Sequence, residues 1–437
     1  MANMISNFTS QPYNSTKHIR PLENAKDLDP LLDRIGDSRY VLLGEASHGT
    51  HEYYTWRAEI SKRLIEEKGF SFVAVEGDWP DCFEINRWIK GQSGSNKSIE
   101  EVLKNFKRWP TWMWANWEIA AFANWMKKFN SNQKDDKKIG FYGLDVYSLW
   151  ESMETIVKYL EKEDPETAVL AKQAADCFEP YRKNDSYVTA YRGLNQKCRT
   201  EVIELLKEVR GNTEKYDHEP EAGLNAELNS LVLKNAEKYY EAMAKFDSSS
   251  WNVRDTHMVE TLNRLMDYHG EDSKVIIWEH NTHIGDARAT DMAAHGMHNV
   301  GQLVRQQHQE EGVVLVGFGS YEGSVVAGSF WGAEMEKMEL PKAIEGSVER
   351  ILHKYGAENK LLIFDDKSPL KELFSERIGH RAVGVVYDPH RERGNYVPSK
   401  MSDRYDAFLY IDKTEGLHPL HLKPDGGKTP ETYPFGI

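Results

Sequence analysis

Short apolar runs recur along the chain, and stretches with helical spacing separate the first of them. The runs consist mainly of Val, Ile, Leu, Phe and Tyr, without strict alternation between apolar and polar residues. This pattern is typical of strands that are covered on both faces of a sheet. We predict strands at YVLLGE, FSFVAVEGD, KIGFYGLDV, KVIIWEHNTH, GVVLVGFGS, NKLLIFDD, RAVGVVYDP and AFLYID.

The stretch between the first two runs predicts a helix. In EYYTWRAEISKRLIEEKG the apolar residues recur at helical spacing, and Gly69 follows Lys68, as glycine often does at the end of a helix. The order strand, helix, strand indicates an α/β fold, with a mostly parallel central sheet and helices on both faces.

The middle of the chain has a different pattern. No strand-like run interrupts the sequence from Leu149 to Met266, and its helical period is clear. We therefore predict a first α/β half (1–148), an inserted helical subdomain (149–266) and a second α/β half (267–437). Pro and Gly are scattered rather than gathered in a linker, which favours one compact domain overall.

Acidic and imidazole side chains follow several of the predicted strands. Because ligands of open parallel sheets bind beyond the carboxyl ends of the strands, we expect these side chains to meet in one cleft. An acid after a strand is often only a cap or a turn residue. For Asp78 and Asp145, each considered alone, this structural role and a functional role are both open. The side chains are Glu45, His48, Glu76, Asp78, Asp145, Glu279, His280, His283, Asp388 and His390.

Hydrolysis without a metal is one reaction that this cluster could perform. His48 would act as the general base on a water molecule, and Glu45 or Glu76 would orient its ring. The groups expected to stabilise the developing oxyanion are His280 or His283, together with Arg57. No cofactor would be required.

A divalent metal site is the alternative that the same residues allow. His280, His283 and Glu76 would bind the ion, and water would occupy the open position. The helical H-E-x-x-H signature is absent, because the two histidines of EHNTH are three residues apart. The sequence also lacks a G-x-S-x-G elbow, which disfavours a serine α/β-hydrolase.

Tryptophans gather in the segment FKRWPTWMWANWE. Packing against the sheet explains at least two of them, but indole rings near a polar cleft also suit stacking on sugars or an apolar pocket. We predict Trp112 and Trp114 as substrate-binding residues, along with Asp78 and Asp145. The segment Ser324–Pro341 is predicted as a long mobile loop, a lid that carries Trp331 to the substrate.

Composition limits the partners and the compartment. A net charge of −14 disfavours nucleic acid and anionic membranes as partners. Three widely spaced cysteines, Cys82, Cys177 and Cys198, suggest a reducing compartment rather than a disulfide framework. The N-terminal segment shows no signal-peptide pattern, and no run of eighteen apolar residues occurs. We expect a cytoplasmic protein that acts on a small-molecule or glycan substrate.

Several motifs together resemble the erythromycin esterase family, some of whose relatives carry a succinoglycan biosynthesis label. The resemblance extends from about Tyr40 to Asp412 and rests on LLGEASHGTHEYYTWR, VAVEGDWP, PTWMWANWE, GFYGLDVYSLW, WNVRDTHMVETL, IIWEHNTHIGD and RGNYVP. It implies an α/β body with a helical subdomain, and hydrolysis of a macrolactone ester by histidine-activated water. By motif position, the base would be His48 with Glu45 and Glu76 in support; Arg57, His280 and His283 would complete the cleft. The resemblance settles neither the metal nor the substrate.

Three further expectations complete the analysis. A protein of a polysaccharide pathway, binding or modifying an exopolysaccharide such as succinoglycan, is the non-esterase alternative. The Arg254–Asp255 pair is interpreted as structural, a salt bridge beneath the cleft, in preference to a substrate contact. Residues near the rim of the site would be Tyr387, Asp388, His390 and Arg391.

Overall fold

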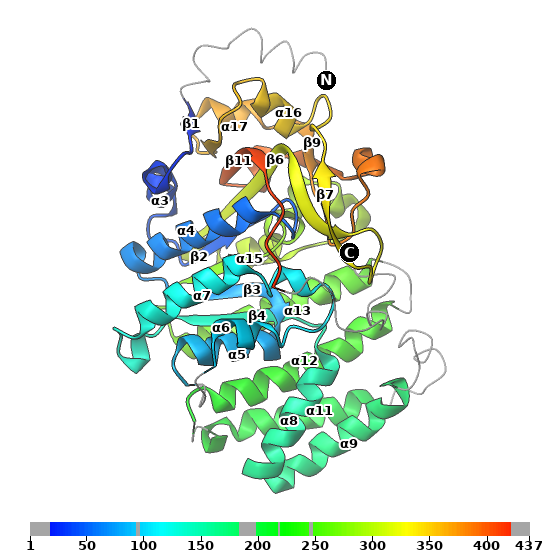
Figure 1. Cartoon of the computed structure of the whole chain (residues 1–437). Helices are drawn as coiled ribbons and strands as arrows, with labels where there is room; N and C mark the ends of the chain where they lie inside the picture. The colour runs from blue at the N-terminus through cyan, green and yellow to red at the C-terminus, as the bar shows by residue number, and fades with distance from the viewer. Residues whose placement is uncertain (1–17, 93–96, 183–197, 217–218, 244–247, 421–437) are drawn as a thin grey trace.

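The computed structural model describes residues 18–92, 97–182, 198–216, 219–243 and 248–420 (Figure 1). A nine-stranded sheet crosses the molecule in the order β1-β8-β11-β6-β2-β5-β3-β4, and β7 pairs with β6. The strands are β1 (Ile19–Pro21), β2 (Tyr40–Leu43), β3 (Phe72–Asp78), β4 (Gly140–Asp145), β5 (Val275–Trp278), β6 (Val313–Gly328), β7 (Met335–Leu340), β8 (Lys360–Ile363) and β11 (Ala407–Thr414).

The sheet is mostly parallel, as the sequence predicted. The neighbours β4, β3, β5, β2, β6 and β11 all pair in parallel, whereas β8 is antiparallel to both β11 and β1. The chain passes from β2 to β3 and leaves a place between them, which β5 fills after the helical region. At such a switch in strand order, the loops at the carboxyl ends separate and leave room for a ligand.

One predicted strand is absent from this sheet. The run RAVGVVYDP forms only single bridges, Ser47 with Val383 and Gly328 with Val386. Val383 and Tyr387 pack instead against the hairpin of β6 and β7, so its apolar side chains are buried without a strand ladder. A separate two-stranded sheet, β9 (Arg377–Arg381) with β10 (Tyr396–Lys400), lies on either side of this run in sequence.

Helices cover both faces because successive strand residues point to opposite sides. Val41 and Leu43 belong to one apolar core, and Tyr40 and Leu42 to the other. The first core is closed by α3 (Asp29–Ile35), α4 (His51–Lys68), α6 (Ile99–Leu103) and α7 (Trp117–Asn130). The second is closed by α12 (Ala222–Met243), α13 (Ser249–His269), α15 (Val300–His308), α16 (Val348–His353) and α17 (Pro369–Leu373); α5 (Trp79–Ile89) contributes to both.

The predicted insertion is helical throughout its described residues. It consists of α8 (Leu149–Glu163), α9 (Pro165–Arg182), α11 (Cys198–Gly211), α12 and α13, and Figure 1 shows the first four at the end of the molecule beyond β4. α8, α9, α11 and part of α12 share an apolar core of their own. None of the helices in the described part of the chain is long and apolar enough to cross a membrane.

The cysteine prediction is wrong for two of the three residues. Cys177 of α9 and Cys198 of α11 form a disulfide, and their Cα atoms are 5.5 Å apart, while Cys82 is free and buried. The packing of α9 against α11 brings the two residues together, which sequence spacing alone does not indicate. The N-terminal segment on which the signal-peptide expectation is based lies outside the described residues.

The predicted mobile loop 324–341 is a β-hairpin, so that prediction is wrong. β6 continues to Gly328 and pairs with β7 in the register from Gly323–Leu340 to Gly328–Met335. Apolar residues of both strands are buried together beneath the hairpin, and this packing fixes the ladder. Only the turn carries exposed aromatic surface: the Phe330 side chain is 65% exposed.

Two glycines, Gly49 and Gly69, lie at the two ends of α4, the helix that follows the turn with His48. Gly69 has φ +70° and ends α4 as predicted. Gly49 touches the hairpin: its carbonyl accepts a hydrogen bond from the Val326 amide at 2.9 Å, and a Cβ at this position would lie 1.8 Å from the Val326 carbonyl oxygen. The turn that carries His48 is therefore pressed against β6.

Replacement of Gly49 by alanine should separate this turn from β6. We expect Gly49→Ala to lower the free energy of unfolding by about 1–3 kcal/mol, since the clash is with backbone and cannot be relieved by a rotamer change. Gly394→Ala is the matched control, because a Cβ there meets nothing within 4 Å. Urea unfolding measures both variants; equal stability of the two would contradict the contact.

Candidate active site

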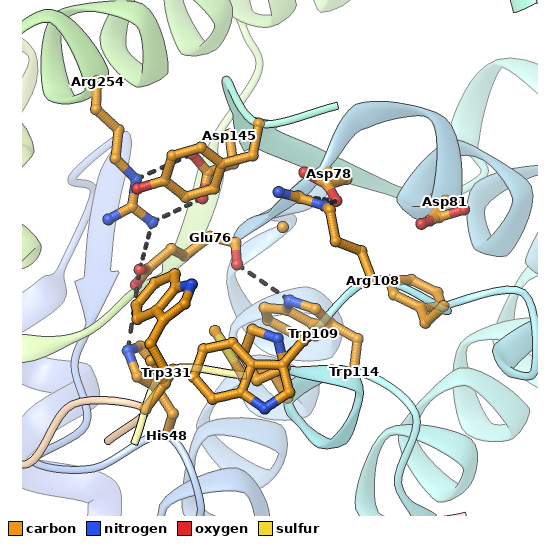
Figure 2. Close-up of a pocket in the computed structure, with 16 residues that line it drawn as sticks. His48, Glu76, Asp78, Asp81, Arg108, Trp109, Trp114, Asp145, Arg254 and Trp331 are labelled. Atoms are coloured by element: carbon orange, nitrogen blue, oxygen red, sulfur yellow. Dashed lines mark hydrogen bonds and ion pairs between the residues drawn. The ribbon is translucent and has the colours of Figure 1, made fainter. Parts of the chain in front are cut away.

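A cavity opens at the carboxyl ends of β3 and β4, next to the turn that follows β2 (Figure 2). Charged side chains and aromatic rings both line it. Its lining residues are His48, Glu76, Gly77, Asp78, Asp81, Phe106, Arg108, Trp109, Pro110, Met113, Trp114, Asp145, Tyr147, Arg254, Trp331 and Val385. The sequence-based expectation that strand-end acids and a histidine meet in one place is met by His48, Glu76, Asp78 and Asp145.

His48 is held from behind by a chain of buried charges. Its Nδ1 is 2.8 Å from Glu45 Oε1, and Glu45 Oε2 accepts from Arg57 Nη2 at 2.6 Å. All three side chains are buried. Since the carboxylate can only accept, Nδ1 of His48 carries the proton and Nε2 is directed toward the cavity.

Arg57 therefore lies behind the site and not in it. Its guanidinium also packs over the rings of Tyr54 and Trp278, at 4.4 and 4.8 Å. Arg57 projects from α4 into the core and does not line the cavity. The prediction that Arg57 faces a developing oxyanion is not met by this placement, which instead suits a residue that positions Glu45.

Arg254, which sequence analysis interpreted as structural, joins three strand ends. Its Nη2 contacts Glu76 Oε1 at 2.7 Å and Asp145 Oδ2 at 2.6 Å, and its Nε donates to Asp145 Oδ1 at 3.0 Å. Its Nη1 lies 3.0 Å from Nε2 of His283. Figure 2 shows Arg254, Glu76 and His48 along one side of the cavity.

His283 is fixed on both of its ring nitrogens. Nδ1 is 2.9 Å from Asp255 Oδ2, and Nε2 faces the Arg254 guanidinium, which can only donate. The Trp251 ring stacks on the imidazole at 4.5 Å. Arg254 and Asp255 thus hold His283 between them and form no salt bridge with each other, contrary to the predicted pair.

His280 stands beside His48, with ring centroids 4.9 Å apart. Its Nδ1 accepts from the Thr282 amide at 3.3 Å as the cap of α14 (Asn281–Ile284), so a neutral ring carries its proton on Nε2. That nitrogen is buried and has no hydrogen-bond partner among the described residues. Burial and the neighbouring His48 hold the pKa of His280 well below its ordinary value, so the ring stays neutral.

Burial and neighbouring charges shift the pKa values of the acids and bases of the site in different directions. Burial opposes ionisation of Glu76, but His283, His48 and Arg254 outweigh it and lower its pKa. Burial likewise opposes protonation of His48, but Glu76 and Glu45 outweigh it and raise its pKa above 6.5. Glu279 lies behind the site, and burial together with Glu76 raises its pKa well above its ordinary value. Neighbouring positive charges thus favour the ionised form of Glu76, and burial favours the protonated form of Glu279.

A second pair of acidic residues, Asp78 and Asp81, lies on the other side of the cavity. Arg108 contacts Asp78, with Nε 2.9 Å from Oδ2, yet burial raises the pKa of Asp78 to about 6. Burial and the nearby Asp78 raise the pKa of Asp81 well above its ordinary value. Figure 2 shows these two carboxyls on the side away from Glu76 and His48. Asp81 and Arg108 were absent from the sequence-based set, because neither follows a strand directly.

Tryptophans form the apolar wall, but not all the predicted ones. Trp114 lines the cavity and donates from Nε1 to the Glu76 carbonyl at 3.0 Å. Trp331, at the tip of the β6–β7 hairpin, meets Trp109 with ring centroids 4.7 Å apart. Trp112 is buried against Trp109 and does not line the cavity, so Trp109 takes the place predicted for it.

The predicted rim residues lie elsewhere. Tyr387 is buried and donates to Glu392, and Asp388 caps the turn that begins at Pro389. The Arg391 side chain is 88% exposed. None of these residues, nor His390, lines the cavity.

The predicted metal set does not suit an ion in this arrangement. Both nitrogens of His283 face Asp255 and Arg254, and Nδ1 of His280 is bound within its own turn. Glu76 Oε1 receives Arg254 and Oε2 receives the His280 amide at 2.8 Å. The ligand atoms of these three residues do not form a group in reach of one ion within the described part of the chain.

Removal of the Arg254 charge should destabilise the fold in a pH-dependent way. We expect Arg254→Met to lower the free energy of unfolding by about 3–5 kcal/mol at pH 8, because Glu76 and Asp145 stay buried without their cation. The two carboxyls would then have pKa values above those of the unfolded chain, so the folded state takes up protons and the loss shrinks toward pH 5.

The control for this variant is Arg264→Met. Arg264 lies on the same helix and pairs with Glu227, and its side chain is 30% exposed; we expect a loss of less than about 1 kcal/mol. Chemical unfolding at both pH values provides the measurement. A loss for Arg254→Met that is as small as the control, or that grows toward acid pH, would contradict the role assigned to the guanidinium.

Comparison with known proteins agrees with this architecture. The family model described as Erythromycin esterase matches residues 65–414. The chain is 27% identical over 431 residues to a protein named erythromycin esterase type II of Escherichia coli, covering 91% of this chain and 96% of that protein.

Two solved structures share the fold. The crystal structure of a succinoglycan biosynthesis protein matches with a TM-score of 0.75 and 20% identity, over 95% of this chain and 98% of that one. The structure of a mutant of the erythromycin esterase EreC in its open conformation matches with a TM-score of 0.66 and 14% identity, over 91% and 97% of the two chains. The family match supports a hydrolase, and the chain belongs to the erythromycin esterase family.

Proposed function

We propose that the protein hydrolyses an ester or lactone bond with a water molecule that His48 activates. The observation that carries this proposal is the position of the His48 ring: Nδ1 is fixed by Glu45, and Nε2 lies 4.0 Å from Glu76 Oε1 at the cavity wall. That distance is long for a direct hydrogen bond, but one water molecule can contact both atoms. Such a water would be oriented by Glu76 and deprotonated by His48.

Three features would lower the barrier to attack by this water. Glu45 stabilises the imidazolium that forms when His48 takes the proton, and Arg57 holds Glu45 in place. The fixed positive charge of Arg254 at the cavity wall is the group available for the negative charge that develops on the carbonyl oxygen. The His48 imidazolium would then protonate the leaving alkoxide, which returns the ring to its neutral form.

The cavity walls favour a substrate with two kinds of surface. Trp109, Trp114 and Trp331 offer an apolar face for an aliphatic ring or chain. Asp78 and Asp81 offer carboxyls that can hydrogen-bond hydroxyl or amino groups. Macrolides combine an apolar lactone ring with hydroxyl and amino groups, so they are the first substrates to test. An acyl group of an exopolysaccharide is the second class.

We also propose that the reaction needs no metal and that the protein is cytoplasmic. The occupied nitrogens of His283 favour the metal-free route over the alternative with His280, His283 and Glu76 as ligands.

Loss of the base should abolish turnover and leave the fold intact. We expect His48→Asn to reduce kcat/KM by about 10²–10⁴-fold on any ester or macrolide that the wild-type protein hydrolyses, which is the usual contribution of general base catalysis. His295→Asn, at an exposed position outside the cavity, is the control and should retain full activity. Full activity of a folded His48→Asn protein would exclude His48 as the base.

The pH dependence of kcat/KM should show the effect of Glu45 on the pKa of His48. Activity requires neutral His48, so kcat/KM should rise with pH through an apparent pKa above 6.5, the direction expected from Glu76 and Glu45. Glu45→Gln removes one of these charges and should shift this rise to lower pH while reducing the plateau rate. Glu59→Gln, elsewhere on α4, should leave the profile unchanged. A shift to higher pH, or none, would contradict the assigned contact.

A further inference from the structure

Two histidines and a glutamate meet at a second place, and none of the three lines the cavity described above. They come from the first turn of α4 (His51), the first turn of α7 (Glu118) and the segment after β11 (His418). Nδ1 of His51 is 2.6 Å and Nδ1 of His418 is 2.7 Å from the same atom, Glu118 Oε1. In the described part of the chain, this is the group of three such residues whose ligand atoms all lie within 4.8 Å of one another.

The glutamate is buried and only partly satisfied. The Glu118 side chain is 4% exposed, and its second oxygen, Oε2, is buried without a hydrogen-bond partner among the described residues. Both imidazoles thus converge on one oxygen while the other has no donor. A buried carboxylate oxygen without a donor is costly, and a cation that both Glu118 oxygens bind, beside the two rings, would satisfy it.

Access and charge also suit a cation. The side chains of His51 and His418 are 35% and 56% exposed, so an ion can enter from solvent and the rings can turn. Besides Glu118, the charged groups that act on His51 are Glu52 and Glu415, both acidic. Glu52 Oε2 accepts from the Glu415 amide at 2.9 Å, which holds these two together.

We propose that His51, Glu118 and His418 form a site for a divalent transition metal, with zinc as the first candidate. Two imidazoles and one carboxylate are a common zinc ligand set, and water would complete the coordination. Ligand atoms about 2.0–2.1 Å from zinc lie roughly 3.3 Å apart. The two Nδ1 atoms must therefore move away from Oε1 by about 0.6–0.7 Å, which rotation of the exposed rings permits, and must lose their protons.

A bound metal would link the segment after β11 to the first turns of α4 and α7, and we call this link the clamp. This segment already pairs with both: the His51 amide donates to Glu415, and the Trp117 amide donates to His418, at 2.8 and 3.0 Å. Leu420 donates to Ala115, next to the cavity residue Trp114. Metal binding would couple this clamp to the turn after β2 and to the wall of the cavity, because binding energy at such a site adds to the stability of the folded state.

Zinc binding to the full-length protein tests the proposal. Protein treated with a chelator and then freed of it is titrated with zinc chloride in a calorimeter. We expect one equivalent to bind with a Kd in the micromolar range or below. His51→Gln, His418→Gln and Glu118→Gln should each weaken binding at least tenfold, with the fold verified by circular dichroism. His295→Gln replaces an exposed histidine outside the group and should bind as the wild type does.

A second readout addresses the clamp. Zinc should slow amide hydrogen exchange at residues 415–420 and 115–118 in the wild type but not in His418→Gln. Absence of zinc binding, or binding that the three variants leave unchanged, would overturn the site. Binding that the variants weaken, without slower exchange in these segments, would overturn the clamp.

Discussion

The Arg254 guanidinium is the contact on which the site depends. It lies on α13, the last helix of the insertion, and it meets carboxylates from the ends of β3 and β4 and an imidazole that follows β5. Glu76 and Asp145 are buried, and two carboxylates this close to one another require a cation between them. The arginine thereby ties the two halves of the sheet together at the edge where the cavity opens.

This arrangement explains how one cavity holds acids and bases of opposite character. Arg254 and the two histidines lower the pKa of Glu76, whereas burial dominates at Glu279 and Asp81 and raises theirs. The charge on Glu76 in turn helps to raise the pKa of His48. A carboxylate whose ionised form is favoured, a titratable imidazole and carboxyls whose protonated form is favoured therefore coexist in and around one cavity. This is the condition that acid–base catalysis at neutral pH requires.

Much of the fold and part of the site could be predicted from the sequence. Apolar runs identify strands because burial on both faces leaves a local pattern, and the convergence of Glu76, Asp145 and His48 follows from parallel pairing. The partners of Arg254 and Arg57 could not be predicted because both residues lie on helices, where the sequence does not show which partners a long side chain reaches. Trp109 and Trp112 lie in the same segment, and only the local turn of the backbone decides which of the two rings lines the cavity. The Cys177–Cys198 pair and the hairpin at Trp331 depend on tertiary contacts that leave no local signal.

A double-mutant cycle between Arg254 and Glu76 tests the central claim most directly. The free energy of unfolding is measured for Arg254→Met, Glu76→Gln and the double variant at one pH above neutrality. If the guanidinium serves to hold the buried carboxylate, the second substitution relieves the first, and the two effects deviate from additivity by about 1–3 kcal/mol. Effects that add to within about 0.5 kcal/mol would show that the two residues act independently, and the account would be wrong.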